Sequence, residues 1–225
     1  GRMTTRTEDW LLVFVKAPSD GAVKTRLVPP FSPEQAAELY RCLVRDTLEA
    51  VRSLRGLRVV IAYAADSRFP DVRWLETRYE TLVQQGRTLG ERLIQTSQWA
   101  FSHEARRVVI IGSDAPDLSS IWIQQAFQAL DESDVVIGPT TDGGYQLIGL
   151  TRPHPELFVD MPWSSPQVFE RMCQRITRLG LTARCLEPIA DLDTPADVQG
   201  YVMQLDPCRR QTHTARYLTL DPQRP

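Results

Sequence analysis

The chain carries four short apolar runs, and each of them is followed by a segment with a helical pattern. The runs are WLLVFVKA at 10–17, LRVVIAYA at 57–64, RRVVIIGS at 106–113 and SDVVIGP at 133–139. Runs that are apolar on both faces are typical of parallel strands that are covered by helices on both sides. The pattern therefore predicts an α/β fold, with a mostly parallel central sheet and helices on both faces.

The first helix has the clearest start signal. Ser32 and Gln35 form a capping box, and Pro33 stands at the first helical position. An apolar stripe follows at helical spacing, made of Tyr40, Leu43, Val44, Thr47, Leu48, Val51 and Leu54. Strand, loop, helix and strand make a right-handed βαβ unit.

Weaker patterns predict further elements along the chain. Helices are expected at 89–101, 119–130, 165–179 and 195–204, and GPTTDGGYQLIGL at 138–150 predicts a strand that leaves the sheet through a tight turn. The stretch after Pro207 is polar and has little pattern. We therefore expect one domain over 10–204, followed by a tail over 205–225.

Composition narrows the classes of protein. The 225 residues are 42% hydrophobic and 24% charged, as in ordinary globular domains, and the formal charge of −2 gives no sign of a nucleic-acid partner. No apolar run approaches the roughly 20 residues of a membrane helix, so we expect a cytoplasmic protein with no membrane partner. The sequence does not indicate an oligomeric state.

The cysteines and histidines do not form a site pattern. Cys42, Cys173, Cys185 and Cys208 include no Cys-x-x-Cys pair, so neither a zinc knuckle nor a disulfide framework is predicted. His103, His154 and His213 lie apart from the loops described below, which disfavours a zinc site or a Ser-His-Asp triad.

In open α/β sheets, ligands bind at the carboxyl ends of the strands, and the loop KAPSDGAVKTRL at 16–27 follows the first strand there. It is no P-loop, because Val23 precedes the Lys-Thr pair. Its turn residues Ala17, Pro18 and Gly21, with the cationic groups of Lys24 and Arg26, suit a di- or triphosphate. The alternative is that both cationic side chains only solvate a loop.

Ser113 and Asp114 follow directly after a buried strand, at the same edge of the sheet. Ser113 is predicted to contact the nucleotide, and the Asp114 carboxylate is well placed to hold Mg²⁺ or Mn²⁺ beside substrate phosphates. Asp117 opens a helix, so capping is the simpler interpretation there.

A second carboxylate is expected if Asp114 holds a metal, and ADLDTPADV at 190–198 offers two. We predict Asp193 as the second ligand, with Asp191 as the alternative. Thr194 and Pro195 are good helix-start residues on structural grounds alone.

Two further motifs are candidates for the sugar or acceptor. Asp142, Gly143 and Gly144 serve either a hairpin turn or close approach of a ligand to the backbone, and both roles are compatible. Trp163 and Ser164 in MPWSSP either line an acceptor pocket or belong to the core.

The segment QQGRTLGERL at 84–93 is a candidate for the nucleotide. Gly86 and Gly90 give a flexible start to a helix and are predicted to lie near the nucleotide. Arg87 or Arg92 contacts either phosphate or solvent.

Taken in order, these motifs resemble a known family. The series KAPSDGAVKTRL, GRTLGERL, GSDAPDLS, GPTTDGGYQLIGL, PWSSPQVF and DLDTPADV, over about residues 10–204, resembles bacterial glycosyltransferases associated with arsenosugar biosynthesis or radical-SAM enzymes. These belong to the GT-A-like nucleotide-diphospho-sugar transferase superfamily. The series is also similar to guanylyltransferases that activate phospholactate or phosphoenolpyruvate.

The resemblance implies a GT-A-like domain, a nucleotide held by the first-strand loop, and a divalent ion at Asp114 and Asp193. The expected function is a metal-dependent transferase that moves a glycosyl group from a nucleotide-sugar donor to a small-molecule acceptor. Lys24, Arg26 and Asp114 would be its catalytic residues. The alternatives are nucleotidyl transfer from a nucleoside triphosphate, with pyrophosphate release, and a catalytically silent nucleotide-binding protein.

A typical GT-A glycosyltransferase carries Asp-x-Asp at the metal-binding strand end. Asp117 stands one position too late for that motif, which favours the nucleotidyltransferase pattern.

Overall fold

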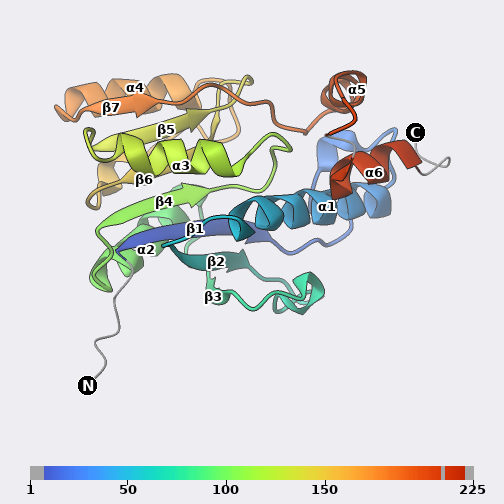
Figure 1. Cartoon of the computed structure of the whole chain (residues 1–225), viewed down its shortest axis with the longest axis horizontal. Helices are drawn as coiled ribbons and strands as arrows, with labels where there is room; N and C mark the ends of the chain where they lie inside the picture. The colour runs from blue at the N-terminus through green and yellow to red at the C-terminus, as the bar shows by residue number, and fades with distance from the viewer. Residues whose placement is uncertain (1–7, 209–210, 221–225) are drawn as a thin grey trace.

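The computed structural model describes residues 8–208 and 211–220 (Figure 1). A seven-stranded sheet in the order β3-β2-β1-β4-β6-β5-β7 forms the middle layer. Its strands are β1 (Asp9–Lys16), β2 (Arg58–Ala64), β3 (Glu80–Val83), β4 (Arg107–Ile111), β5 (Val135–Pro139), β6 (Tyr145–Leu150) and β7 (Ala183–Cys185). The predicted α/β architecture is confirmed.

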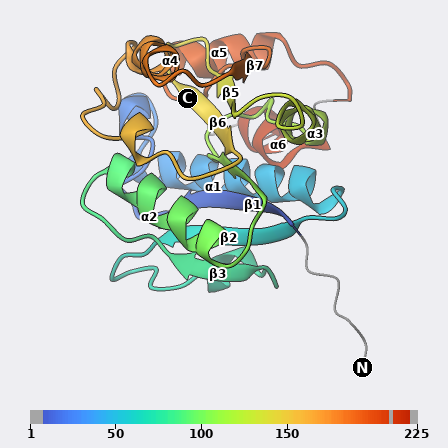
Figure 2. The same cartoon turned by 90° about the vertical axis from the view of Figure 1, so that its left-hand side faces the viewer.

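Helices cover both faces of the sheet, as Figure 2 shows. They are α1 (Pro33–Arg52), α2 (Leu89–Ser102), α3 (Ser120–Ala129), α4 (Val168–Arg178), α5 (Pro195–Met203) and α6 (His213–Leu220), with short 3₁₀ turns at Thr25–Leu27, Arg73–Leu75 and Pro155–Leu157. Alternate side chains of β1 enter different cores, because Leu11 and Val13 pack under α1 and α3 whereas Leu12 packs under α2 and α4.

Most strand pairs are parallel, but β6 runs antiparallel to both β4 and β5. The predicted turn is present, because Thr140 N donates to Gly144 O at 3.0 Å. The strand after it does not leave the sheet, and that part of the prediction was wrong: β6 inserts between β4 and β5, where Leu147 and Ile148 are buried.

The predicted capping box of α1 is present. Gln35 N donates to Ser32 Oγ at 3.1 Å, and Ser32 N donates to Gln35 Oε1 at 2.9 Å. Thr194 and Asp197 form a second capping box at the start of α5, whereas the Thr88 and Ser119 side chains cap α2 and α3 by accepting from Glu91 N and Trp122 N. The helices predicted from 89, 119, 165 and 195 thus lie where the sequence placed them, within a few residues.

Helix α6 lies in the segment predicted as a patternless tail and was missed. The Asp46 carboxylate on α1 accepts from His213 N at 2.8 Å and from Thr214 N at 2.9 Å, and the Tyr217 hydroxyl donates to Gln35 O at 3.0 Å. Tyr217 joins a third core with Leu27 and Leu192. This core ties the first-strand loop to the segment before α5. Within the described residues, no helix has the length and apolar character needed to span a membrane.

Candidate active site

The side chain of Lys24 connects the loops at the carboxyl ends of β1, β4 and β7. Its Nζ atom lies 2.8 Å from Asp114 Oδ1 and 2.8 Å from Asp193 Oδ1, and the Lys24 side chain is only 2% exposed. The backbone of Lys24 is left-handed, at φ 52° and ψ 38°, which turns this side chain inward while Thr25 and Arg26 face solvent. The structure therefore brings together three of the residues predicted from the sequence.

The charges of this cluster stabilise one another. Burial by itself lowers the pKa of Lys24, but the carboxylates of Asp114 and Asp193 outweigh burial and raise that pKa above its ordinary value. Burial conversely raises the pKa of Asp114, but the charges of Lys24 and Lys16 and the hydrogen bonds from Lys24 and Gln146 together outweigh burial and lower that pKa. Lys24 and Asp114 are thus both ionised at neutral pH.

Arg26 stands at the outer side of the cluster. Its NH1 atom lies 3.9 Å from Asp193 Oδ2, and its side chain is 68% exposed. The guanidinium is therefore available to an incoming anion. Ala17 and Pro18 are buried, and Gly21 has a φ of +80°. None of the three lines either of the two cavities described below, so we assign them to the shape of the loop.

A second cluster consists of carboxylates only. Oxygen atoms of Asp142, Asp191 and Asp193 lie within 4.8 Å of one another. Burial, with the charges of Asp114 and Asp142, raises the pKa of Asp191 to about 8. Asp191 Oδ1 is buried and has no hydrogen-bond partner among the described residues. An all-oxygen donor set with an unsatisfied carboxylate suits a hard divalent cation.

The sequence had paired Asp114 with Asp193 as metal ligands. In the structure Lys24 bridges these two residues, and the carboxylates that gather around Asp193 are Asp191 and Asp142. Asp142 also accepts from Gly144 N at 3.2 Å and from Thr140 Oγ1. Its place in the cluster depends on the β5–β6 turn, which local sequence does not reveal.

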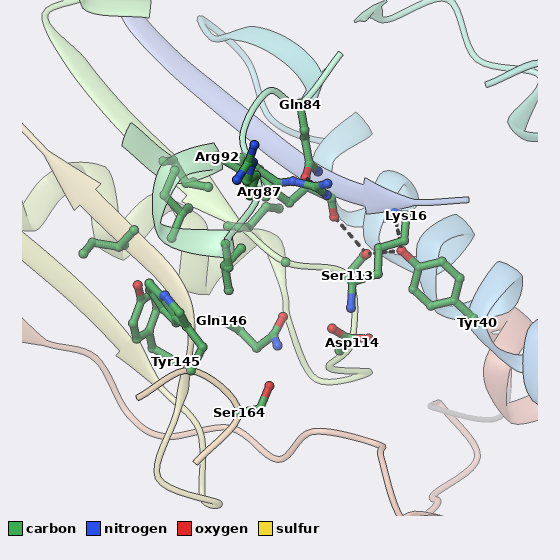
Figure 3. A pocket seen from close by; sticks show the side chains of 18 residues that line it. Lys16, Tyr40, Gln84, Arg87, Arg92, Ser113, Asp114, Tyr145, Gln146 and Ser164 are labelled. Atoms are coloured by element: carbon green, nitrogen blue, oxygen red, sulfur yellow. Dashed lines mark hydrogen bonds between the residues drawn. The ribbon is translucent and has the colours of Figure 1, made fainter. Parts of the chain in front are cut away.

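Two cavities meet at Asp114. The first has a volume of about 690 Å³ and is lined mainly by charged and polar groups, including Lys24, Arg26 and the three clustered carboxylates. The second has a volume of about 400 Å³ and extends under the start of α2 (Figure 3). Both cavities are lined by Lys16, Tyr40, Leu89, Asp114, Tyr145, Gln146, Trp163 and Ser164. The two cavities therefore form one cleft. We call the larger cavity its polar compartment and the smaller cavity its apolar compartment.

Hydrogen bonds under the cleft hold β1, α1 and β4 together. Ser113 Oγ donates its one hydrogen to Phe14 O at 3.0 Å. The Tyr40 hydroxyl must therefore donate to Ser113 Oγ, at a distance of 3.2 Å. Tyr40 in turn accepts from Lys16 N at 2.7 Å. Figure 3 shows these bonds beside Asp114. Ser113, predicted to contact nucleotide, lines the apolar compartment and anchors the ends of the strands.

The other glycines predicted for the site permit close packing, line the cleft or shape a turn. A Cβ at Gly90 would lie 2.2 Å from Phe158 O, and at Gly143, where φ is +95°, it would lie 2.1 Å from Pro166 O. These two glycines allow the loop of Trp163 and Ser164 to pack closely. Gly144 lines the polar compartment, and Gly86, at φ +130°, shapes the turn before α2.

Sequence reasoning missed several residues that line the cleft. Gln146 donates a side-chain hydrogen bond to Asp114, and a Cβ at Gly112 would lie 2.1 Å from Gln146 Oε1. Tyr145 and Lys16 also line both compartments. The available signal was Gln146 itself, a polar residue at the start of an otherwise apolar strand.

This fold and cleft define a class: an α/β domain of the kind found in nucleotidyltransferases and nucleotide-diphospho-sugar transferases. The chain belongs to the family described as "Uncharacterized protein conserved in bacteria (DUF2064)", whose profile matches residues 47–165. It is 33% identical to a protein of known structure from Desulfovibrio desulfuricans G20 that is proposed to be a nucleotide-diphospho-sugar transferase. The TM-score is 0.88, and the match covers 95% of this chain and 94% of that one.

More distant relatives extend the comparison. The chain is 28% identical over 130 residues to the 2-phospho-L-lactate guanylyltransferase of Methanocaldococcus jannaschii, covering 57% of this chain and 54% of that protein, so it matches about half of that relative's length. The 4-diphosphocytidyl-2C-methyl-D-erythritol synthase of Anaerococcus prevotii shares the fold, with a TM-score of 0.59 at 10% identity over 87% of this chain and 98% of that one. The predicted resemblance to nucleotide-diphospho-sugar transferases and to a phospholactate guanylyltransferase is confirmed, and the proteins that match the chain are named as transferases.

Proposed function

We propose that this protein is a nucleotidyltransferase. It binds a nucleoside triphosphate in the cleft, transfers the nucleoside monophosphate to a small phosphorylated or acidic acceptor, and releases pyrophosphate. The observation that carries the proposal is the buried ammonium of Lys24, which is held by two carboxylates where the loops after β1, β4 and β7 meet. A fixed cation at this position is suited to charge that grows during phosphoryl-group transfer.

The reaction follows from this placement. An oxygen of the acceptor attacks the α-phosphorus and a new P–O bond forms; the P–O bond to the bridging oxygen between the α- and β-phosphorus breaks, and its electron pair leaves with pyrophosphate. Lys24 and Arg26 stabilise the negative charge that develops on the phosphate oxygens. A phosphate or carboxylate acceptor is already ionised at neutral pH, so no general base is required.

A divalent cation belongs to the proposal. The Asp142, Asp191 and Asp193 carboxylates, with Asp114 beside them, would hold Mg²⁺ or Mn²⁺, and the ion would neutralise phosphate charge. The unpartnered Asp191 Oδ1 supports this assignment, because a buried carboxylate oxygen without a donor is costly to leave unsatisfied.

Nucleotidyl transfer is preferred to glycosyl transfer for two reasons. Asp117 lines neither compartment, so it does not act with Asp114 as an Asp-x-Asp pair would. The similarity to a guanylyltransferase over 130 residues points in the same direction. Glycosyl transfer from a nucleotide sugar stays the second candidate, because the relative from Desulfovibrio desulfuricans matches nearly the whole chain and is proposed to be a nucleotide-diphospho-sugar transferase.

Product analysis separates the candidates. The protein is incubated with Mg²⁺, each of the four nucleoside triphosphates or common nucleotide sugars, and a panel of small phosphorylated and carboxylate acceptors. Acceptor-dependent pyrophosphate release that is lost in Lys24→Met supports the proposal. Release of a nucleoside diphosphate from a nucleotide sugar supports glycosyl transfer instead. Nucleotide binding with no product from either donor would indicate a catalytically silent protein.

A further inference from the structure

The lining of the apolar compartment suits a ring system with one polar edge. Its walls are apolar or aromatic and come from Phe14, Leu89, Leu93, Ile110, Ile111, Tyr145, Ile148 and Trp163. Gln84, Arg87 and Arg92 line it near the start of α2 (Figure 3). Pockets of this kind bind a ligand by burial and select it through a few fixed polar groups.

Main-chain contacts fix the orientation of the Gln84 side chain. Gln84 Nε2 donates to Ala62 O at 2.8 Å, and Gln84 N donates to Tyr63 O at 2.9 Å. The Nε2 atom is therefore the amide donor on the β2 side, which leaves Gln84 Oε1 as an acceptor. The Arg92 NH1 atom lies 3.4 Å from that oxygen and donates to it.

A second contact orients the Arg92 guanidinium. Arg92 Nε donates to Gly86 O at 3.0 Å, in the turn that Gly86 makes at φ +130°. A guanidinium carries five N–H groups, so three remain after these two bonds. The Gln84 side chain and the Gly86 carbonyl therefore fix the position of the guanidinium. Its remaining N–H groups can donate to a ligand.

Hydrogen-bond acceptors are scarce at this end of the compartment. Gln84 Oε1 already accepts from Arg92, and Gln146 Oε1, which is buried beside Gly112, is an acceptor without a partner among the described residues. Asp114 is the one carboxylate among the described lining residues, and it lies at the junction with the polar compartment, paired with Lys24. A ligand edge at Arg92 must therefore supply acceptors.

We propose that Arg92, oriented by Gln84, reads the nucleobase of the donor and selects a purine with a 6-carbonyl group. Such a base presents O6 and N7 as two neighbouring acceptors, which is the pattern that a guanidinium binds through two hydrogen bonds. Adenine presents an amino donor in place of O6, and the pyrimidines have no counterpart of the O6 and N7 pair. Cytosine carries its two neighbouring acceptors, O2 and N3, on a different edge, next to the ring nitrogen that is bonded to the ribose, so CTP is the strictest comparison. This inference rests on the proposed nucleotide-binding function and adds the specificity of its donor.

Affinity measurements with five triphosphates and one ligand without a base test the inference. Dissociation constants are measured by calorimetry, with Mg²⁺, for GTP, ITP, ATP, UTP, CTP and inorganic tripolyphosphate. ITP keeps O6 and N7 but lacks the 2-amino group. We expect GTP and ITP to bind about 10- to 100-fold more tightly than ATP and CTP. Tripolyphosphate gives the affinity that the phosphates supply alone.

Variants of Arg92 identify the residue. Arg92→Met removes the donors and should bring GTP to the level of ATP, with ATP itself little changed. Arg92→Lys keeps the charge but not the two-pronged geometry, so it should lose most of the discrimination. Arg171→Met is the matched control, because it removes the same charge from an exposed position on α4. Melting temperatures show whether each variant is folded.

The outcomes distinguish this inference from the proposed function. The inference fails if ATP or CTP binds as tightly as GTP and ITP. It also fails if Arg92→Met weakens the binding of all triphosphates equally, because Arg92 then contacts phosphate or acts only through its charge. In both cases the proposal of nucleotidyl transfer still stands. If every triphosphate binds no better than tripolyphosphate, the compartment takes no base. Absence of any triphosphate binding and of pyrophosphate release defeats the proposed function itself.

Discussion

Lys24 shows how one residue can couple stability to chemistry. Replacing it with methionine leaves Asp114 and Asp193 facing each other without their shared cation. Because these side chains are 29% and 34% exposed, the loss is smaller than for a fully buried pair, and we expect Lys24→Met to lower the free energy of unfolding by about 1–3 kcal/mol. Urea denaturation at neutral pH measures it.

Two variants control that measurement. Arg26→Met removes a guanidinium that is mostly exposed and 3.9 Å from Asp193, so it should cost less than about 1 kcal/mol. The double variant Lys24→Met with Asp193→Asn should recover part of the loss, because it also removes one of the repelling charges. Equal stability of Lys24→Met and Arg26→Met would show that the buried cluster is not coupled as described.

Tyr40 is the second residue with a testable role. Its hydroxyl accepts from Lys16 N and donates to Ser113 Oγ, so Tyr40→Phe leaves a main-chain N–H without its partner. We expect a loss of about 1–2 kcal/mol in the free energy of unfolding. Tyr79→Phe is the control, because within the described residues no bond of the Tyr79 hydroxyl is seen. A loss no greater than that of the control would exclude the anchoring role of Tyr40.

At the level of elements, we predict that alanine has opposite effects on stability at two glycines in helices. A Cβ at Gly90 in α2 would lie 2.2 Å from Phe158 O, so Gly90→Ala must push away the loop that carries Trp163. We expect it to destabilise the protein by about 1–3 kcal/mol. Gly200 in α5 has open space around its Cβ position, and Gly200→Ala should stabilise the protein by about 0.5–1 kcal/mol through helix propensity. Thermal denaturation compares the two variants, and a stabilised Gly90→Ala would contradict the close packing.

Helix α6 depends on its docking to α1. Asp46 accepts from two N–H groups at the start of α6, so Asp46→Ala should cost about 1–2 kcal/mol and raise hydrogen exchange in residues 213–220. Glu49→Ala is the matched control on the exposed side of the same helix. If exchange in α6 is the same in both variants, the carboxylate of Asp46 does not hold the helix in place.

The dependence on docking also explains which elements the sequence predicted. Strands β1, β2, β4 and β5 are buried, so their apolar runs were visible, and α1 carried a capping box. The β3 strand lies at an edge of the sheet and is mostly exposed, which removes the apolar signal. Helix α6 is short and gains its stability from contacts with α1, which no local pattern encodes.

The same division holds for the candidate site. Lys24, Asp114 and Asp193 could be expected to meet, because each follows a strand of one sheet and the ends of parallel strands share an edge. The contribution of Asp142 requires the antiparallel return of β6, and the pairing of Gln84 with Arg92 requires the turn at Gly86. These are contacts between segments whose relative positions only the folded chain defines.

For the whole molecule, the cleft joins loops from the parallel side of the sheet to loops beyond β6. A nucleoside triphosphate with Mg²⁺ would contact both sets of loops, so its binding should stabilise the entire fold. At 100 times the dissociation constant we expect about 2.7 kcal/mol, or a rise of about 5–10 °C in melting temperature for a chain of this size. Chelation of the metal by EDTA should remove most of that rise. Asp191→Asn should abolish the metal-dependent part while leaving the ligand-free protein at least as stable, because it replaces a buried acidic group whose ionisation is opposed by burial and by the neighbouring carboxylates. A full metal-dependent rise in Asp191→Asn would show that the ion is held elsewhere, and a less stable ligand-free variant would show that the Asp191 carboxylate serves the fold instead.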